Sequence, residues 1–151
     1  MHLIAYVSEY VGNNIAKDGM KIMQASLRNN RERDVTAVLF YYDEKFIQVL
    51  EGDEVKLREL VEIIDNDSRH KNLSVFVDVP TLSKLHKNWN MDLFILADDD
   101  KDSSYMLEYF VKFQNGTLNY ITANKFIESF RSFIKSFESH KLLLGDLDSP
   151  Q

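Results

Sequence analysis

The sequence contains no cysteine among its 151 residues. Disulfides, zinc ribbons and thiol nucleophiles are therefore excluded together. Glycine and proline are scarce as well, with five and two residues, which leaves little room for a long linker. No apolar run approaches the roughly 20 residues that span a bilayer, and the first residues lack the pattern of a signal peptide. These absences predict a cytoplasmic protein.

Basic residues are in the minority, with 18 Lys and Arg against 24 Asp and Glu, for a net charge of −6. A protein that follows nucleic-acid phosphates needs the opposite charge, so we expect no nucleic-acid partner. Hydrophobic residues make up 44% of the chain, which is enough to build a core and excludes extended disorder. The length suits one globular domain, with or without a helical extension.

Five short segments rich in β-branched and aromatic residues have the pattern of strands. They are residues 2–8, 35–42, 45–51, 73–79 and 90–96. The two-residue connection Asp43-Glu44 predicts a hairpin between the second and the third. Two helices are predicted between strands, the first capped by Asn13 or Asn14 and the second by Asp53. The order β-α-β-β-α-β-β predicts an α+β fold with one sheet and two helices on one face.

The polar segment 97–102, with three consecutive aspartates, ends this pattern. We therefore predict a first domain over residues 1–97 and a C-terminal two-helix extension over residues 98–151. Two aromatic stripes with helical spacing lie in the extension: Met106, Tyr109, Phe110 and Phe113, then Phe126, Phe130, Phe133, Ile134 and Phe137. Burying one Phe gains roughly 1.5–3 kcal/mol, so the stripes are predicted to cover the free sheet face or to join a neighbouring subunit.

The usual signatures of enzymes are missing. There is no glycine-rich phosphate loop, nucleophile elbow or His cluster with metal-ligand spacing, so neither an enzyme nor a metal site is predicted. A small ferredoxin-like enzyme, such as an acyl-phosphate hydrolase, would need an anion-binding loop with a positioned arginine. The glycine-poor turn after Ser8 does not provide one.

One glutamine stands in an unusual place. Gln48 lies between Ile47 and Val49 in an apolar strand, and an unpaired buried amide costs about 1–3 kcal/mol. Either Gln48 reaches water from an edge strand, or it bonds a buried polar partner. Tyr6 and Ser8 share parity on the first strand and therefore one face of the sheet. The pair Asn29-Asn30, at the end of the first helix, has the composition of a helix C-cap.

Several short motifs together resemble a known family. They are Tyr6-x-Ser8, Asn29-Asn30 followed by Val35-Thr36, the run Phe46-Ile47-Gln48-Val49-Leu50-Glu51-Gly52, Asp67-x-Arg69-His70 and Trp89-x-Met91. In this order and spacing they resemble the BLUF family, blue-light sensors that use flavin. The resemblance covers about residues 1–96, and the two-helix tail is similar to the short members that lack a fused effector.

The resemblance implies a ferredoxin-like fold with a flavin, FAD or FMN, between the two helices. It implies that Ile22 and Ile64 enclose the isoalloxazine ring and that Asn30 bonds its pyrimidine edge. The full set of cofactor-binding residues that it implies is Asn30, Asn29, Gln48, Ile22, Ile64, Arg69 and Asp67, with the last two on the tail side of the flavin. Two isoleucines with amide partners suit a ring that has apolar faces and one polar edge.

The resemblance also implies photochemistry rather than turnover. Tyr6 would give an electron and a proton to the excited flavin, and the Gln48 amide would rotate or tautomerise as the charges recombine. Gln48 suits this role because its amide carries a donor at one end and an acceptor at the other. Ser8 would stand beside this pair, and Trp89 and Met91 would report the change to the last strand and the C-terminal helices.

Three positions depart from the family's usual pattern. Asp34 and Ala37 replace glycines, and His86 replaces an aromatic residue. Ala37 is expected to tighten the packing beneath the ring, and Asp34 to take a less strained turn conformation than glycine permits. These changes would lower flavin affinity without abolishing it, since the positions of Tyr6, Gln48 and the asparagines are intact.

Two functions remain open at this point. The first is a blue-light photoreceptor that signals through its C-terminal helices to a downstream protein or to another subunit of a homo-oligomer. The alternative is a light-insensitive relative that acts as a protein-interaction module. The second would be colourless even with excess flavin.

Overall fold

The computed structural model describes residues 1–86, 90–118 and 123–148, with side chains as far as residue 138. The chain divides into two units, Met1–Leu96 and Ala97–Gln151. Trp89, a predicted reporter of the switch, lies outside the described residues. In the described part, none of the helices is long and apolar enough to cross a membrane.

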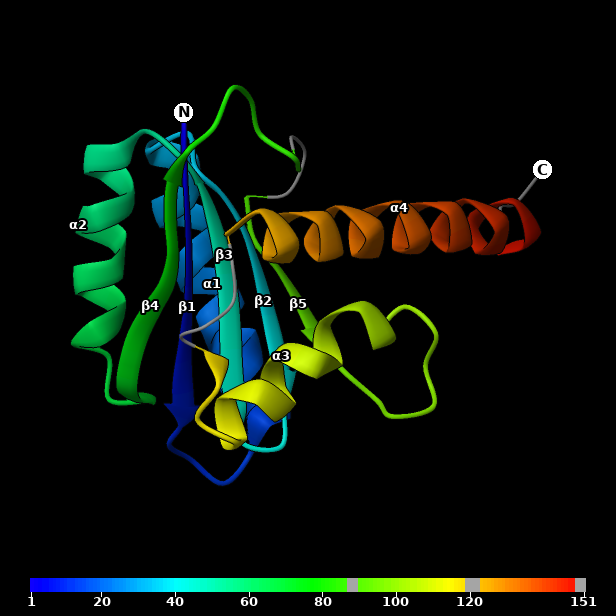
Figure 1. Ribbon diagram of the computed structural model, residues 1–151, viewed down its shortest axis with the longest axis horizontal. Coiled ribbons are helices and arrows are strands. Elements are labelled where there is room, and N and C mark those ends of the chain that lie inside the picture. The colour runs from blue at the N-terminus through cyan, green and yellow to red at the C-terminus, as the bar shows by residue number, and fades with distance from the viewer. Residues whose placement is uncertain (87–89, 119–122, 149–151) are drawn as a thin grey trace. The chain divides into compact units, whose positions relative to one another are not determined.

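A five-stranded sheet forms the first unit (Figure 1). Its strands are β1 (His2–Tyr10), β2 (Thr36–Tyr42), β3 (Lys45–Gly52), β4 (His70–Pro80) and β5 (Asp92–Ile95). They lie in the order β4-β1-β3-β2-β5, antiparallel except for the parallel pair β2–β5. Asp43 and Glu44, with φ of 50° and 61°, join β2 to β3. Both have the positive φ of a type I′ hairpin turn, so the predicted connection is confirmed.

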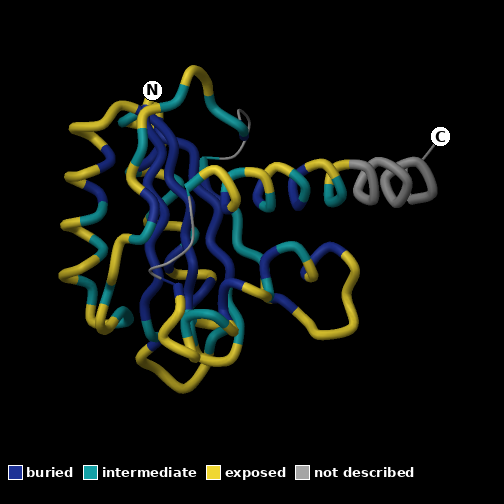
Figure 2. The backbone as a smooth tube through the Cα atoms, viewed as in Figure 1, coloured by how far each residue is buried: buried dark blue, intermediate teal, exposed yellow. Residues whose placement is uncertain are grey.

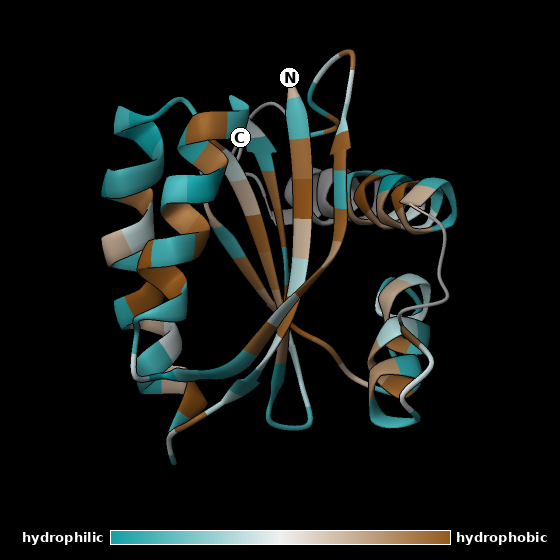
Figure 3. Cartoon of the chain, turned by 60° about the vertical axis from the view of Figure 1, so that its left-hand side comes forward, coloured by the Kyte–Doolittle hydropathy of each residue, from teal (hydrophilic) through white to brown (hydrophobic). Residues whose placement is uncertain are grey.

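Two helices lie side by side on one side of this sheet (Figure 3). The helix α1 (Ile15–Glu32) begins after Asn14, whose side chain accepts a hydrogen bond from the Lys17 N–H at 3.1 Å. The helix α2 (Glu54–Asp65) begins after Asp53, which caps the Lys56 N–H at 3.2 Å in the same way. These bonds satisfy backbone donors that a first helical turn leaves without partners. The predicted α+β, ferredoxin-like order is confirmed.

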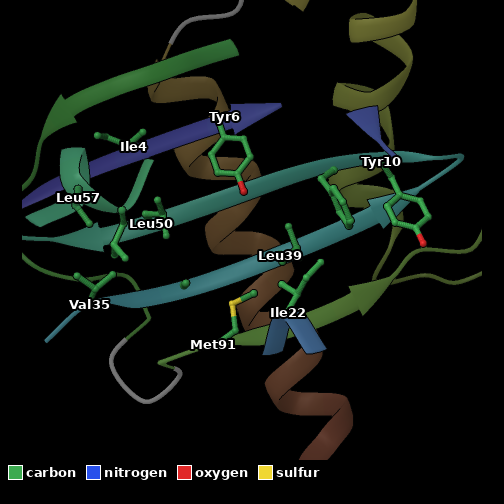
Figure 4. Packing of buried hydrophobic residues seen from close by; sticks show 12 residues of the cluster. Ile4, Tyr6, Tyr10, Ile22, Val35, Leu39, Leu50, Leu57 and Met91 are labelled. Atoms are coloured by element: carbon green, nitrogen blue, oxygen red, sulfur yellow. The ribbon is translucent and has the colours of Figure 1, made fainter. Parts of the chain in front are cut away.

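The core fills the space between the two helices and the sheet. Leu57 and Leu60 of α2 and Ile22 of α1 pack on residues of every second position in the strands (Figure 4). The sheet contributes Ile4, Tyr6, Tyr10, Ala37, Leu39, Phe46 and Leu50 to this cluster. Figure 2 shows the central strands buried along most of their length and much of α2 exposed. One face of the sheet therefore lies directly beneath the space between the two helices.

Two expectations about turns are wrong. Asp34 does not avoid the glycine-like conformation, because its φ is 52°; Asp tolerates this left-handed region better than most residues. Asn29 and Asn30 do not form the C-cap, because α1 continues to Glu32 and Arg33 is the capping residue. Both asparagines therefore lie in the last turns of α1.

The second unit contains α3 (Ser104–Gln114) and α4 (Ala123–Asp148). The predicted aromatic stripes meet each other here. The Tyr109 ring lies edge-on to the Phe126 ring at 5.0 Å, and its hydroxyl lies 2.7 Å from the Ser129 Oγ. The Phe126 ring is stacked with the Phe130 ring, and the two ring centres lie 6.5 Å apart. Whether this unit covers the sheet or joins another subunit stays a prediction.

Candidate functional site

A cavity of about 90 Å³ lies between α1, α2 and the sheet. This volume is several times what one water molecule requires. The lining residues come from both helices, from β2 and β3, and from the turn into β4 and its first residue: Ile22, Ala25, Ser26, Asn29, Asn30, Leu39, Gln48, Leu50, Leu60, Ile63, Ile64, Asp67, Arg69 and His70. The fold thus brings chain segments far apart in sequence to one pocket.

Every residue that the resemblance implies for cofactor binding lines this cavity. Ile22 comes from α1 and Ile64 from α2, so an apolar side chain lies on each helix. Gln48 projects from β3, and the remaining four residues are Asn29, Asn30, Asp67 and Arg69. Their placement is a finding; their roles stay predictions.

The buried amide of Gln48 has partners at both ends. The Tyr6 hydroxyl donates a hydrogen bond to Gln48 Oε1, and Gln48 Nε2 donates to the Met91 sulfur at 3.6 Å. Tyr6 is fully buried and Gln48 is 3% exposed. Of the two alternatives for Gln48, the structure therefore has the buried polar partner and not the solvent-exposed edge.

The phenol of Tyr6 holds its proton firmly. Burial, and secondly the negative charge of Asp67, raise the pKa of Tyr6 well above its usual value. An uncharged phenol donates a hydrogen bond at any physiological pH. The Tyr6 proton therefore stays on the phenol in the resting protein, and the Gln48 oxygen accepts its hydrogen bond.

Asn30 ties the end of α1 to the segment before β5. Its side-chain Nδ2 donates to the Asn90 carbonyl at 2.6 Å, and the Asn90 side chain donates to the Val35 carbonyl at 3.1 Å. Asn90 carried no sequence signal, because a single asparagine beside a strand is usually a turn residue. The pair fixes Asn30 at the wall of the cavity.

An ion pair stands at another side of the cavity. Arg69 Nη2 lies 2.6 Å from Asp67 Oδ2, and the Arg69 N–H donates to Asp67 Oδ1 at 2.9 Å. The hydrogen bonds from Arg69 hold the pKa of the Asp67 carboxyl below its usual range. Both groups are charged at neutral pH, so this part of the wall is polar.

His70 lines the cavity although no role was predicted for it. Its Nδ1 lies 2.8 Å from the Ser8 Oγ, and its ring lies 4.9 Å from the Phe46 ring. Burial lowers the pKa of His70 to about 4, against the opposing charge of Asp67. Ser8 touches the pocket only through this neutral imidazole. The position of His70 in the motif Asp67-x-Arg69-His70 was the sequence signal that could have pointed to it.

Of the three positions that depart from the family's usual pattern, Ala37 and His86 are buried and Asp34 is exposed. Ala37 is buried in the core cluster beneath the cavity, and His86 is buried after β4, where its N–H donates to Glu51 Oε1 at 3.2 Å. Met91 lies on the same side of the sheet as the cavity, beside Ile22 (Figure 4).

The lining fits a flat ligand with apolar faces and polar edges. Isoleucine and leucine side chains line it from the two helices and the sheet, and the polar lining consists of amides, an ion pair, a serine and an imidazole. Pockets for small molecules commonly combine apolar walls with a few polar groups in this way. Among the described residues no group of three or more His, Cys, Asp or Glu could hold a metal ion.

Comparison with known families identifies the family of the first unit. The model of the BLUF family, described as sensors of blue-light using FAD, matches residues 1–92. Comparison with curated proteins gives no significant match. The matched range contains every cavity residue and also Tyr6, Ser8 and Met91.

Several solved structures have the same fold. BlrB, a BLUF protein in its dark state, is 20% identical with a TM-score of 0.70, over 89% of this chain and 95% of BlrB. BlsA in its photo-activated state is 20% identical with a TM-score of 0.66, over 85% and 91% of the two chains. A bacterial light-regulated adenylyl cyclase is 23% identical with a TM-score of 0.68, over 83% of this chain. The alignment spans only 38% of that cyclase.

Proposed function

The chain belongs to the BLUF family, sensors of blue-light using FAD, and from this membership we propose a blue-light receptor switched by Tyr6 and Gln48. The observation that supports the switch is the hydrogen bond from the Tyr6 hydroxyl to Gln48, made in a buried place beside the cavity. A phenol and an amide enclosed together form a unit that a bound chromophore can rearrange.

The flavin, FAD or FMN, would be held by the residues of the cavity wall. Ile22 and Ile64 would contact the apolar faces of the ring, one from each helix. Asn30, with Asn29 beside it, would bond the polar edge, and Asp67 and Arg69 would lie on the tail side. Asn30 is already fixed by its bond to the Asn90 carbonyl, so little entropy is lost when it meets a ligand.

When bound, the flavin supplies an excited state that accepts one electron under blue light. Tyr6 is the donor in this proposal. Its phenol gives up the electron and, because its pKa is far above neutrality, releases its proton only together with that electron, toward the Gln48 oxygen. When the charges recombine, Tyr6 would regain its electron and its proton, and the Gln48 amide would be left rotated or tautomerised.

Rotation exchanges the two ends of the amide. In the resting arrangement Oε1 faces Tyr6 and Nε2 faces Met91. After rotation a donor faces Tyr6 and an acceptor faces Met91, so the hydrogen bonds around the ring change. The visible absorption band is expected to move to longer wavelength. Met91, with Trp89, would pass the change to β5 and to the C-terminal helices, and from there to a downstream protein or to another subunit of a homo-oligomer.

The experiment compares the flavin-loaded wild type with Tyr6→Phe and Gln48→Leu. Both variants are expected to remain yellow, since neither removes an apolar face of the pocket, but blue light should no longer shift their visible band. A control, Tyr42→Phe, removes the hydroxyl of a half-buried tyrosine on β2 and should keep the full shift. An undiminished shift in either test variant refutes the proposed switch.

A further inference from the structure

A buried acidic residue, Glu51, shares β3 with Gln48 but does not line the cavity. Glu51 is 2% exposed and follows Gln48 by three positions on β3. Because strand side chains alternate, the Glu51 carboxyl group lies on the opposite face of the sheet from the Gln48 amide. Burial of this carboxyl raises its pKa. Specific partners are therefore needed to offset the cost of burying its charged form.

Those partners are two consecutive backbone N–H groups. The Leu85 N–H donates to Glu51 Oε2 at 2.6 Å, and the His86 N–H donates to Glu51 Oε1 at 3.2 Å. Both carboxylate oxygens thus hold the segment that follows β4. Charged acceptors make stronger hydrogen bonds than neutral ones. A glutamine at this position would place an NH₂ donor where one of the two carboxylate oxygens now accepts, opposite one of these N–H groups.

Lys84 strengthens the same attachment. Its ammonium attracts the Glu51 carboxylate and opposes the effect of burial on the Glu51 pKa. The Lys84 Nζ also donates to the Asp34 carbonyl at 2.8 Å. The beginning of this segment is therefore fixed to β3 and to the turn that precedes β2.

The far end of the same segment reaches the switch. The Asn90 side chain is bonded to the Val35 carbonyl, and the next residue, Met91, accepts the hydrogen bond of Gln48 Nε2. Leu85 and His86 are therefore attached to Glu51 on one face of β3, and Met91 is attached to Gln48 on the other face. An attachment at the first end restricts where Met91 can lie.

We propose that Glu51 is a positioning residue of the switch, whose carboxylate anchors Leu85 and His86 so that Met91, which follows closely in the sequence, stays against the Gln48 amide. Glu51 does not line the cavity, and it acts through its bonds to Leu85 and His86. The inference rests on the proposed function where it concerns the lit state, but the contact itself exists in the dark. Loss of the anchor loosens Met91 and alters the return from the lit to the dark arrangement.

The test uses full-length, flavin-loaded Glu51→Gln beside the wild type. Amide hydrogen exchange at Leu85 and His86 and the Met91 methyl NMR signal, assigned by its loss in Met91→Leu, are recorded in the dark. We expect exchange at least tenfold faster at one of the two amides, and a displaced or broadened Met91 signal. After illumination the red shift should form, and its dark recovery should change at least threefold in rate. Glu54→Gln, which removes the same charge from an exposed position on α2, should match the wild type.

A second variant covers the case in which Glu51→Gln does not fold. Glu51→Asp keeps the charge and withdraws the carboxylate by one methylene, so the same signals should move in the same direction by less. In the variant that folds, an unchanged Met91 signal overturns the proposal. Faster exchange with unchanged recovery overturns it too, since Glu51 would then be structural only. A wild type without any light-induced shift refutes the proposed function, and the dark signals still decide whether Glu51 holds Met91.

Discussion

Tyr6 and Gln48 stand directly opposite each other in the register of β1 and β3, and the Tyr6 hydroxyl donates its hydrogen bond to the Gln48 oxygen. Opposed residues in neighbouring strands keep their side chains together. The strand pairing therefore sets the distance between the phenol and the amide before any ligand binds. A one-residue slip in this pairing would separate them onto opposite faces.

Asn30→Ala is expected to weaken both flavin binding and the fold. Asn30 is 3% exposed, and its loss leaves the Asn90 carbonyl without its donor, which costs about 1–3 kcal/mol. If a similar contact to the flavin is lost, the dissociation constant rises roughly tenfold for each 1.4 kcal/mol. Flavin titration and urea unfolding measure the two effects.

The neighbouring Asn29→Ala is the matched control. Asn29 lines the same cavity but is only half-buried, so we expect a change in affinity of less than about threefold, well under 1 kcal/mol. Equal losses of affinity in the two variants would contradict the separate roles given to these asparagines.

Asp34→Gly is expected to stabilise the protein. Asp34 has a φ of 52°, a conformation that costs an L-residue about 1–2 kcal/mol, while the added chain entropy of glycine costs about 0.5–1 kcal/mol. The net gain should be about 0.5–1 kcal/mol, measured as the free energy of unfolding in urea. The Asp34 carbonyl that binds Lys84 is kept. Asp34→Ala should be less stable than Asp34→Gly, and the reverse order would disprove this account of the turn.

The element order and the helix starts were predictable because their signals are local. Asn14 and Asp53 cap the nearby N–H groups of their own helices, and alternation within β1 and β3 put Tyr6 and Gln48 on faces that could meet. The beginning of β4 was not predictable in this way. His70 and Lys71 are polar and resemble a loop, but they pair with Tyr10 and Glu9 of β1, which is a contact between distant segments.

The partners of the site also depend on such distant contacts. The residues left open whether Gln48 reaches water or bonds a buried polar partner, and the acceptor for its Nε2, the Met91 sulfur, comes from 43 residues away. The burial of Glu51 was hidden because glutamate is usually exposed; only the fold brings Leu85 and His86 to it. The C-cap expected at Asn29-Asn30 was wrong for a similar reason, since Asn30 is occupied by Asn90.

The stability of the protein is expected to fall as the pH drops from 7 toward 4, in part through His70. Burial lowers the pKa of His70 to about 4, whereas it is about 6.5 in the unfolded chain. A proton therefore binds the unfolded state first, so the stabilising contribution is complete above about pH 6.5 and lost as the pH falls through 4. At pH 5 the loss should be about 2 kcal/mol.

His70→Gln isolates this effect, because glutamine can still bond Ser8 but does not titrate. Urea unfolding of both proteins at pH 7.5 and 5 should show a smaller loss in the variant, by about 2 kcal/mol. Parallel losses in the two proteins would mean that His70 titrates normally in the folded state.

The visible absorption spectrum of the purified, flavin-loaded protein, recorded in the dark, after blue light and again after dark recovery, tests the central claim most directly. The rearrangement of Gln48 between Tyr6 and the chromophore predicts a band that moves to longer wavelength on illumination and returns completely in the dark. A yellow protein whose band stays in place under blue light would contradict the switch, and a protein that remains colourless in excess flavin would contradict the site.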